Sequence, residues 1–138
     1  MAVLETHAAK ISIDAPFREV ARLVADPARA HEWGTEFYSG PLRRADGDEW
    51  IAPVPMMGGE IRYRHEADVE RGIMDVYLAP PGSDFGPPLP MRVVPNGDGA
   101  DVIVVLARMP GTSTEQWEQG LRGLDLELET LRSLAEGA

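Results

Sequence analysis

The longest helical pattern of the chain covers residues 112–136. Apolar residues recur there at alternating spacings of four and three, which places them on one face of a helix. They are Trp117, Leu121, Leu124, Leu128, Leu131 and Ala135. Ser113 with Gln116, or Thr112 with Glu115, fits a capping box at the start of this helix. The pattern predicts a long amphipathic helix whose apolar face is buried against another part of the molecule.

Two glycines interrupt this otherwise good helix former. Gly120 and Gly123 each cost about 1 kcal/mol relative to alanine in a helix interior. Gly120 lies beside Trp117 and Leu124 on the side that is expected to be buried. Two explanations stay open: close packing against a strand or another backbone, or room left for a ligand.

The N-terminal part of the chain predicts one strand followed by two short helices. Residues 7–13 alternate between apolar and polar, as expected of a half-buried strand. Asp14-Ala15-Pro16 is typical of a helix start, and an apolar stripe follows it from Phe17 to Val24. Asp26-Pro27 predicts a second short helix that ends at Trp33-Gly34.

From Thr35 onward the pattern changes to short alternating segments separated by turn residues. Strands are predicted at residues 36–43, 48–54, 60–69, 73–79, 89–95 and 100–109. Turns are predicted at Asp46-Gly47, Gly58-Gly59, Arg71-Gly72 and the sequence from Asn96 to Gly99. Because no helix intervenes, the strands favour an antiparallel meander. Together the elements predict an α+β fold: a curved seven-stranded antiparallel sheet, two short helices, and a long C-terminal helix packed on the sheet.

Two connections are too long for tight turns. Residues 53–59 and 80–90 hold most of the prolines, several glycines, two methionines and Phe85. One interpretation is a pair of surface loops stiffened by proline. The other is an apolar rim or lid over a pocket, because exposed Met and Phe side chains are otherwise unfavourable.

The charge of the chain limits its partners. The formal net charge is −10, from 13 basic and 23 acidic residues, so the protein repels phosphate backbones and anionic headgroups. We therefore expect no nucleic acid partner. On the long helix, Glu118 precedes Arg122 by four residues and Glu129 precedes Arg132 by three, which are spacings that favour ion pairs.

Several site classes lack their sequence signals. The chain has no cysteine, and its three histidines do not show metal-ligand spacing, so no metal site is predicted. No serine lies in a nucleophile-elbow motif, and no glycine pattern fits a phosphate loop. No apolar run reaches the length of a membrane span, and the N-terminus lacks the pattern of a signal peptide. We expect a single-domain cytoplasmic protein over residues 1–138, without stable membrane insertion and without a tightly bound cofactor.

The strand predicted near residues 59–69 carries the most informative polar residues. Its charged residues share one face, which identifies that face as solvent-exposed, so Tyr63 and His65 are expected to point inward. An inward His two residues from an inward Tyr forms a donor and acceptor pair suited to orienting a ligand hydroxyl or moving a proton beside a carbonyl. A buried histidine satisfied by a neighbour explains the same pattern.

The remaining ligand-binding candidates are apolar or aromatic residues on predicted inward faces and loops. Methionines adapt to irregular ligands but also fill irregular cores, and tryptophans stack on rings but also pack in cores. The full candidate set is Trp33, Trp50, Met56, Tyr63, His65, Met74, Met91, Trp117, Gly120, Leu121 and Leu124. Arg108 is expected to pair with a ligand carboxylate, with Glu118 or with Asp84, and the sequence does not decide among them.

Two stretches resemble a known superfamily. ISIDAPFREVARLVADPARAHEW, residues 11–33, is similar to the opening of START and Bet v 1-like (SRPBCC) proteins, in which a strand ending in Asp-Ala-Pro leads to a helix, Asp-Pro and a Trp. Residues 104–137 resemble the last strand, the Arg-x-Pro-Gly turn and the closing helix of bacterial members. The resemblance covers essentially the whole chain and implies a helix-grip fold. It also implies a mostly apolar cavity between the sheet and the closing helix.

Three functions are compatible with this resemblance, because fold alone does not choose among them. The first is binding of a hydrophobic or aromatic small molecule, such as a lipid, a quinone or a polyketide-like compound. The second is a polyketide cyclase or dehydratase that uses His65 and Tyr63. The third is a protein-interaction module resembling Hsp90-activator-like members. The sequence leaves the oligomeric state open, including a homodimer.

Overall fold

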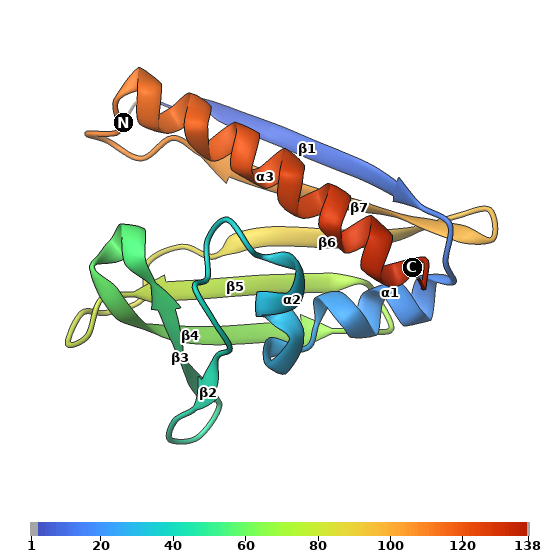
Figure 1. The fold of residues 1–138 in the computed structure, drawn as a ribbon, viewed down its shortest axis with the longest axis horizontal. Coiled ribbons are helices and arrows are strands. Elements are labelled where there is room, and N and C mark those ends of the chain that lie inside the picture. The colour runs from blue at the N-terminus through green and yellow to red at the C-terminus, as the bar shows by residue number, and fades with distance from the viewer. Residues whose placement is uncertain (1–2, 138) are drawn as a thin grey trace.

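The computed structural model describes residues 3–137 and contains a curved antiparallel sheet of seven strands in the order β1-β7-β6-β5-β4-β3-β2 (Figure 1). The strands are β1 (Thr6–Ile13), β2 (Arg43–Arg44), β3 (Glu49–Val54), β4 (Gly59–Asp68), β5 (Ile73–Ala79), β6 (Leu89–Asn96) and β7 (Gly99–Ala107). The α-helices are α1 (Phe17–Val24), α2 (Ala30–Trp33) and α3 (Thr114–Ala135), and the 3-10 turns are η1 (Pro27–Arg29) and η2 (Pro55–Met57). The predicted α+β helix-grip architecture is confirmed.

The prediction of a strand over residues 36–43 is wrong for most of that range. Only Arg43–Arg44 form a strand, and residues 35–42 form a loop after α2. The carbonyl of Gly34 accepts hydrogen bonds from the backbone N–H groups of Phe37 (3.2 Å) and Tyr38 (2.9 Å), which folds the chain into a turn. The apolar residues that suggested a strand instead pack this loop onto the inner face of the sheet.

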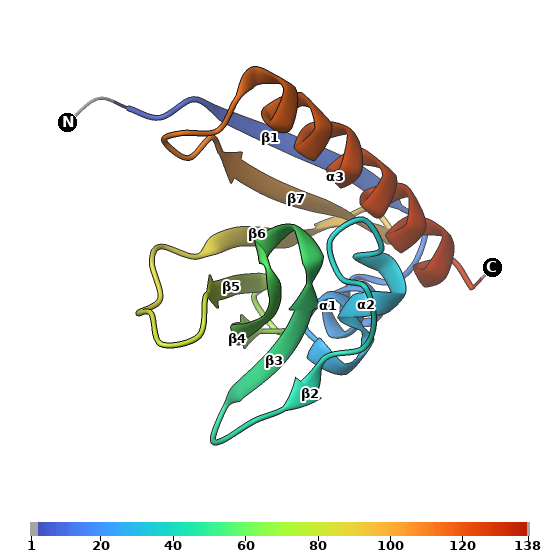
Figure 2. The ribbon, with the colours of Figure 1, turned by 60° about the vertical axis from the view of Figure 1, so that its left-hand side comes forward.

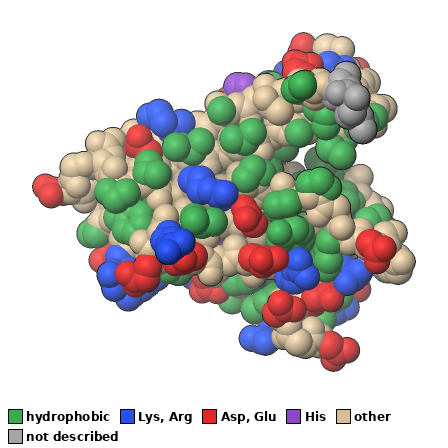
Figure 3. Space-filling model, turned by 180° about the vertical axis from the view of Figure 1, so that it is seen from behind, with side chains coloured by type: hydrophobic (Ala, Val, Ile, Leu, Met, Phe, Trp, Pro, Cys, Tyr) green, Lys and Arg blue, Asp and Glu red, His purple; other side chains and the backbone are tan. Residues whose placement is uncertain are grey.

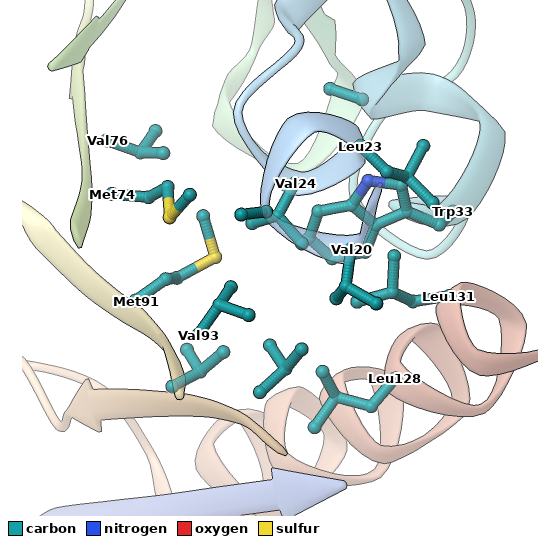
Figure 4. Close-up of a cluster of buried hydrophobic side chains, with 14 of the residues drawn as sticks. Val20, Leu23, Val24, Trp33, Met74, Val76, Met91, Val93, Leu128 and Leu131 are labelled. Carbon is teal, nitrogen blue, oxygen red and sulfur yellow. The ribbon is translucent and has the colours of Figure 1, made fainter. Parts of the chain in front are cut away.

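The hydrophobic core is concentrated at the end of the sheet that α1 and α2 cover (Figure 4). Side chains from α1, α2, β5, β6 and α3 meet there, and Figure 4 shows Met74 and Met91 directed toward α1. The labelled residues of this cluster are Val20, Leu23, Val24, Trp33, Met74, Val76, Met91, Val93, Leu128 and Leu131. Each has at most 8% of its surface exposed, so this end of the interior is filled by side chains.

The N-terminal end of α3 is held by a second, polar attachment. The Ser113–Gln116 capping box forms, with Gln116 N–H donating to Ser113 Oγ at 3.1 Å and Ser113 N–H donating to Gln116 Oε1 at 3.0 Å. The indole Nε1 of Trp117 donates to Glu5 Oε2 at 3.2 Å. Arg108 donates to the other oxygen of Glu5 at 3.1 Å and to the carbonyl of Thr112, which decides its partners in favour of Glu5 over Glu118 or Asp84. These bonds connect α3 to the start of β1 and the end of β7.

The β4–β5 turn has two structural reasons for a glycine at position 72. Its φ is +68°, and a Cβ at this position would lie 1.9 Å from the carbonyl oxygen of Val93. Gly97 has a similar φ of +58° but no atom near such a Cβ, so it isolates the cost of the left-handed backbone. We expect Gly97→Ala to lower the free energy of unfolding by about 1 kcal/mol. Gly72→Ala should cost at least about 2 kcal/mol more, because the turn must move. Urea denaturation measures both, and equal losses would show that the close approach to β6 is unimportant.

Candidate functional site

The inner face of the sheet is covered unevenly. On β5, β6 and β7, the inward residues are buried beside α1 and become half-exposed toward the opposite end of the sheet. Toward the open end, the inward residues follow one another in the order Met74, Val76 and Leu78 on β5, Val93, Met91 and Leu89 on β6, and Val102, Val104 and Leu106 on β7. The last residue on each strand is partly exposed and the others are buried. The strand pairing aligns these gradients, because Val76 lies opposite Leu89 and Met91 lies opposite Val104. The apolar interior is therefore open at one end.

Helix α3 shows the same gradient along its inner face. Leu131 and Leu128 are 0% and 2% exposed, whereas Leu124 and Leu121 are half-exposed. At Gly120, a Cβ would have no neighbouring atom within 4 Å, so this glycine faces open space. Gly123 differs, because its Cβ would lie 3.4 Å from Cβ of Glu36 in the loop after α2. The two glycines therefore differ: Gly123 lies close to the Glu36 side chain, whereas no described atom lies near the position of a Cβ at Gly120.

The sheet itself separates at this open end. β6 pairs with β7 only as far as Met91 and Val104, while β7 continues beside β1 until Thr6 lies opposite Ala107. Leu89 stays with β5, and Leu106 stays with β1. Figure 3 shows a hollow in the upper right of its view, bordered by hydrophobic side chains. We use the name leucine cleft for the partly exposed inward residues at this end of the molecule, which are Leu78, Leu89, Leu106, Gly120, Leu121 and Leu124.

Some of the predicted candidates lie in this cleft and others are buried away from it. Gly120, Leu121 and Leu124 lie in the cleft. Four others are buried: Trp33, Met74, Met91 and Trp117 are at most 8% exposed. Leu89 and Leu106 of the cleft were not among the residues that the sequence singled out. Their alternation shows that they face inward, but only the separation of β6 from β7 leaves them uncovered.

Two further candidates lie away from the cleft. Trp50 is half-buried on β3, where the guanidinium of Arg44 on the edge strand β2 lies 5.4 Å from its ring centroid. Met56 in η2 is 69% exposed. It borders a shallow hollow of about 240 Å³, which is lined by Thr35, Glu36, Phe37, Tyr38, Ser39, Pro55 and Met56. The exposed methionine of residues 53–59 thus lies on the rim of a surface hollow.

Phe85 does not form part of a lid over the interior. It folds onto the outer face of the sheet, where its ring lies 4.3 Å from the guanidinium carbon of Arg62 and 6.1 Å from the ring of Tyr77. Arg62 also donates to a backbone carbonyl of the same loop. The lid hypothesis for residues 80–90 is wrong as far as it depended on Phe85, because cation–π contacts hold this side chain on the opposite face.

Tyr63 and His65 point inward as predicted and contact each other. The Tyr63 hydroxyl lies 3.3 Å from Nδ1 of His65, and the Tyr63 ring packs edge-on against Tyr38 of the loop after α2. Tyr63 is only 2% exposed. Burial raises the pKa of Tyr63 and lowers the pKa of His65 to about 4, so the imidazole is neutral at pH 7. Its Nε2 is buried and has no hydrogen-bond partner among residues 3–137.

Glu127 on α3 is a second half-buried titratable group. Its Oε2 accepts a hydrogen bond from the backbone N–H of Glu36 at 3.1 Å, and the N–H of Phe37 also contributes. Burial raises the pKa of Glu127 to about 7, although these two bonds act in the opposite direction. Glu127 thereby connects α3 to the loop that covers Tyr63. No sequence periodicity identified it, because it lies beside the apolar stripe rather than on it.

The described part of the chain contains no group of three or more His, Asp or Glu residues arranged to hold a metal ion. Among the helices of residues 3–137, none is long and apolar enough to cross a membrane. A second groove, of about 500 Å³, lies between β1 and α3 on the outside of the molecule. It is lined by Lys10, Ile11, Arg122, Asp125, Leu126, Leu128 and Glu129.

Comparison with known proteins identifies the fold. No protein-family model and no curated protein sequence matches the chain. Among solved structures, the Zhui aromatase/cyclase from Streptomyces sp. R1128 superposes with a TM-score of 0.71 at 13% identity, covering 97% of this chain and 94% of that one. A START superfamily protein from Mycobacterium smegmatis superposes with a TM-score of 0.69 at 14% identity, covering 95% of this chain and 97% of that one. The Aha1 dimer from Colwellia psychrerythraea superposes with a TM-score of 0.66 at 12% identity, covering 97% of this chain and 98% of that one. The fold is that of START/Bet v 1-like proteins, as the sequence resemblance implied.

His65 and Glu127 should give the stability of the protein opposite dependences on pH. The pKa of His65 is lowered from 6.5 to about 4, so the unfolded chain binds more protons and stability falls as pH decreases through that window. The pKa of Glu127 is raised from 4.5 to about 7, so the folded chain binds more protons and stability falls as pH increases through that window.

Thermal unfolding between pH 4 and pH 8 measures these two contributions when each substituted protein is compared with the unsubstituted one. Relative to the unsubstituted protein, His65→Gln should become more stable as pH falls, and Glu127→Gln should become more stable as pH rises. Glu118→Gln controls for the loss of one charge from α3. Parallel pH profiles for His65→Gln and the unsubstituted protein would show that the imidazole is not desolvated in the folded state.

Proposed function

We propose that the protein binds an uncharged hydrophobic small molecule in the leucine cleft. The observation that carries this proposal is the shared gradient of burial on β5, β6, β7 and α3, which leaves apolar side chains half-exposed around one space. Partly exposed leucines on the inner faces of the sheet and α3 are unfavourable in water, and a ligand that covers them recovers about 25 cal/mol per Å² of apolar surface.

Gly120 supports the same conclusion. Glycine in a helix interior costs about 1 kcal/mol relative to alanine, and here the missing side chain is not required by any neighbouring atom. A bound molecule that occupies the space beside Gly120 gives a reason for that cost. The fold neighbours described as an aromatase/cyclase and a START superfamily protein are compatible with a small-molecule site in this fold.

The chemistry of the cleft favours a neutral ligand over a fatty-acid anion. Its walls are leucines and a glycine, and the one polar residue paired with a cleft residue on β1 is His7, opposite Leu106. Arg108, at the end of β7, is already bonded to Glu5 and to the carbonyl of Thr112. The net charge of −10 opposes the approach of an anion. Neutral lipids, quinones and uncharged polyketide-like aromatics meet these conditions.

The cyclase hypothesis is not the one that the geometry supports best. It requires His65 and Tyr63 to reach one solvent-connected pocket, within about 3 Å of a substrate atom. Tyr63 lies opposite Leu78 of the cleft in the β4–β5 pairing, but it is only 2% exposed and its ring is packed against Tyr38. We therefore assign the pair no catalytic role.

The protein-interaction hypothesis also has less support. It requires a large apolar patch on the outer sheet face or the loops. Ion pairs occupy much of the outer face, including Arg62 with Glu49, Arg64 with Glu66 and Arg92 with Asp75. Such a charged face counts against an apolar docking surface there.

A larger side chain at position 120 should weaken ligand binding without destabilising the fold. Gly120→Leu introduces a side chain into open space and removes the helix penalty of glycine, so the ligand-free protein should become more stable by about 1 kcal/mol. The same side chain occupies the proposed ligand space. We expect affinity for Nile red, an uncharged hydrophobic probe, to fall at least about tenfold, measured by fluorescence titration.

Gln119→Leu is the matched control, because it adds the same side chain on the exposed face of α3. It should leave Nile red affinity unchanged. Competition by long-chain alcohols, quinones and flavonoids then ranks the ligand classes. Equal affinity for Nile red in Gly120→Leu and the unsubstituted protein would place binding elsewhere and contradict the proposal.

A further inference from the structure

The outer groove between β1 and α3 combines an open strand edge with an amphipathic helix face. Among the described strands, β1 pairs only with β7, so the backbone groups along its other edge have no strand partner. The strand runs for eight residues, Thr6–Ile13, without a proline. Strand edges of this kind pair readily with another chain unless they are blocked.

Helix α3 contributes to the groove one exposed apolar residue and charged residues without ion pairs in the described part of the chain. Leu126 is 56% exposed, although it is a large apolar residue on the outside of the helix. Within residues 3–137, no ion pair involves Arg122 or Asp125, and the Glu118–Arg122 pair that the spacing predicted does not form. Glu129 pairs with Arg132, as its spacing predicted. An unpaired cation, an exposed leucine and two carboxylates thus line one groove.

The order of these residues is self-complementary. Arg122 and Glu129 lie equally far from the point between Asp125 and Leu126. In Figures 1 and 2, α3 extends along β1, so a two-fold axis through the groove would bring both the strands and the helices of two copies side by side. With the axis at that point, Arg122 lies opposite the partner subunit's Glu129, and the reverse contact forms by symmetry.

The lysine in the groove does not oppose this arrangement. Lys10 lies on β1 near the axis, where its symmetry mate would also be, and like charges directly opposite each other are destabilising. Its ammonium group is 3.6 Å from Asp101 Oδ2, however, so an internal carboxylate already offsets its charge. Leu126 of each copy would lie beside the axis and lose its exposure to water.

We propose that this groove is the interface of a symmetric homodimer in which the β1 edges of two copies pair and Arg122 of each chain contacts the partner subunit's Glu129. A second copy fits better than an unrelated peptide because the charges on α3 match themselves under two-fold rotation. The interface is separate from the leucine cleft, which lies on the inner face of the sheet.

Sedimentation velocity over a range of protein concentrations tests the interface, with a dimer of twice the 15.1 kDa chain mass expected. Arg122→Glu should raise the dissociation constant at least about tenfold, because two attractive pairs become repulsive. Glu129→Arg should do the same, and the double variant should restore association by exchanging the charges. Arg71→Glu is the control, since this exposed arginine lies in the β4–β5 turn.

A disulfide cross-link tests the position of the two-fold axis without a measurement of the dimer dissociation constant. The chain has no cysteine, so Leu126→Cys introduces a single thiol. Oxidation should yield a covalent dimer with Leu126→Cys and little with Arg71→Cys. A monomer at all concentrations, or a dimer whose association is unaffected by Arg122→Glu and not restored in the double variant, would overturn the proposal. Dimerisation that fails while Nile red still binds would leave the ligand proposal intact.

Discussion

The attachment of α3 at two separate places determines the rest of the structure. Near its C-terminal end, Leu128 and Leu131 are buried in the core beside α1 and α2. Near its N-terminal end, Trp117 is buried and hydrogen-bonded to Glu5. Between these attachments, Leu121 and Leu124 lack full cover and Gly120 faces open space. A long helix curves only gently, whereas the strands beneath it twist, so a long helix held at both ends stands away from part of the sheet.

The polar groups of the interior lie beside this space rather than in it. Tyr63, His65 and Tyr38 form a buried aromatic and polar cluster under the loop after α2. Glu127 holds that loop to α3 through backbone N–H groups. Desolvation acts on each titratable group here and disfavours its charged form, so the imidazole and the phenols remain neutral at pH 7. The leucine cleft consequently has mostly apolar walls, with His7 beside Leu106 in the β1–β7 pairing.

Local pattern predicted the elements well because periodicity and capping depend on neighbouring residues. The 3.6-residue stripe of α3, its Ser113–Gln116 cap and the alternation of six strands all follow from short-range preferences. Residues 36–43 were predicted as a strand, yet packing of Tyr38 onto Tyr63 holds most of this segment in a loop. Alternation identifies which side chains face inward, but not which of them another element covers.

The site was therefore only partly predictable. Leu121 and Leu124 were recognised from the stripe and Gly120 as a glycine beside it, whereas Leu89 and Leu106 depend on where β6 and β7 separate, which no local signal reveals. One of the two interpretations of residues 80–90 placed Phe85 over a pocket, but Phe85 lies on the outer face, where it contacts Arg62 and Tyr77. Partners that are distant in sequence, such as Glu5 for Arg108 and Trp117, are likewise properties of the folded chain.

The central claim is that the space beneath the middle of α3 receives an uncharged hydrophobic ligand. The most direct measurement is methyl NMR of leucine-labelled protein during titration with such a ligand. Resonances of Leu106, Leu121 and Leu124 should shift together and saturate at one ligand per chain, while Leu131, which is fully buried in the core, should not move. Shifts confined to Leu126 on the outer surface, or none below the solubility limit of the ligand, would contradict the account.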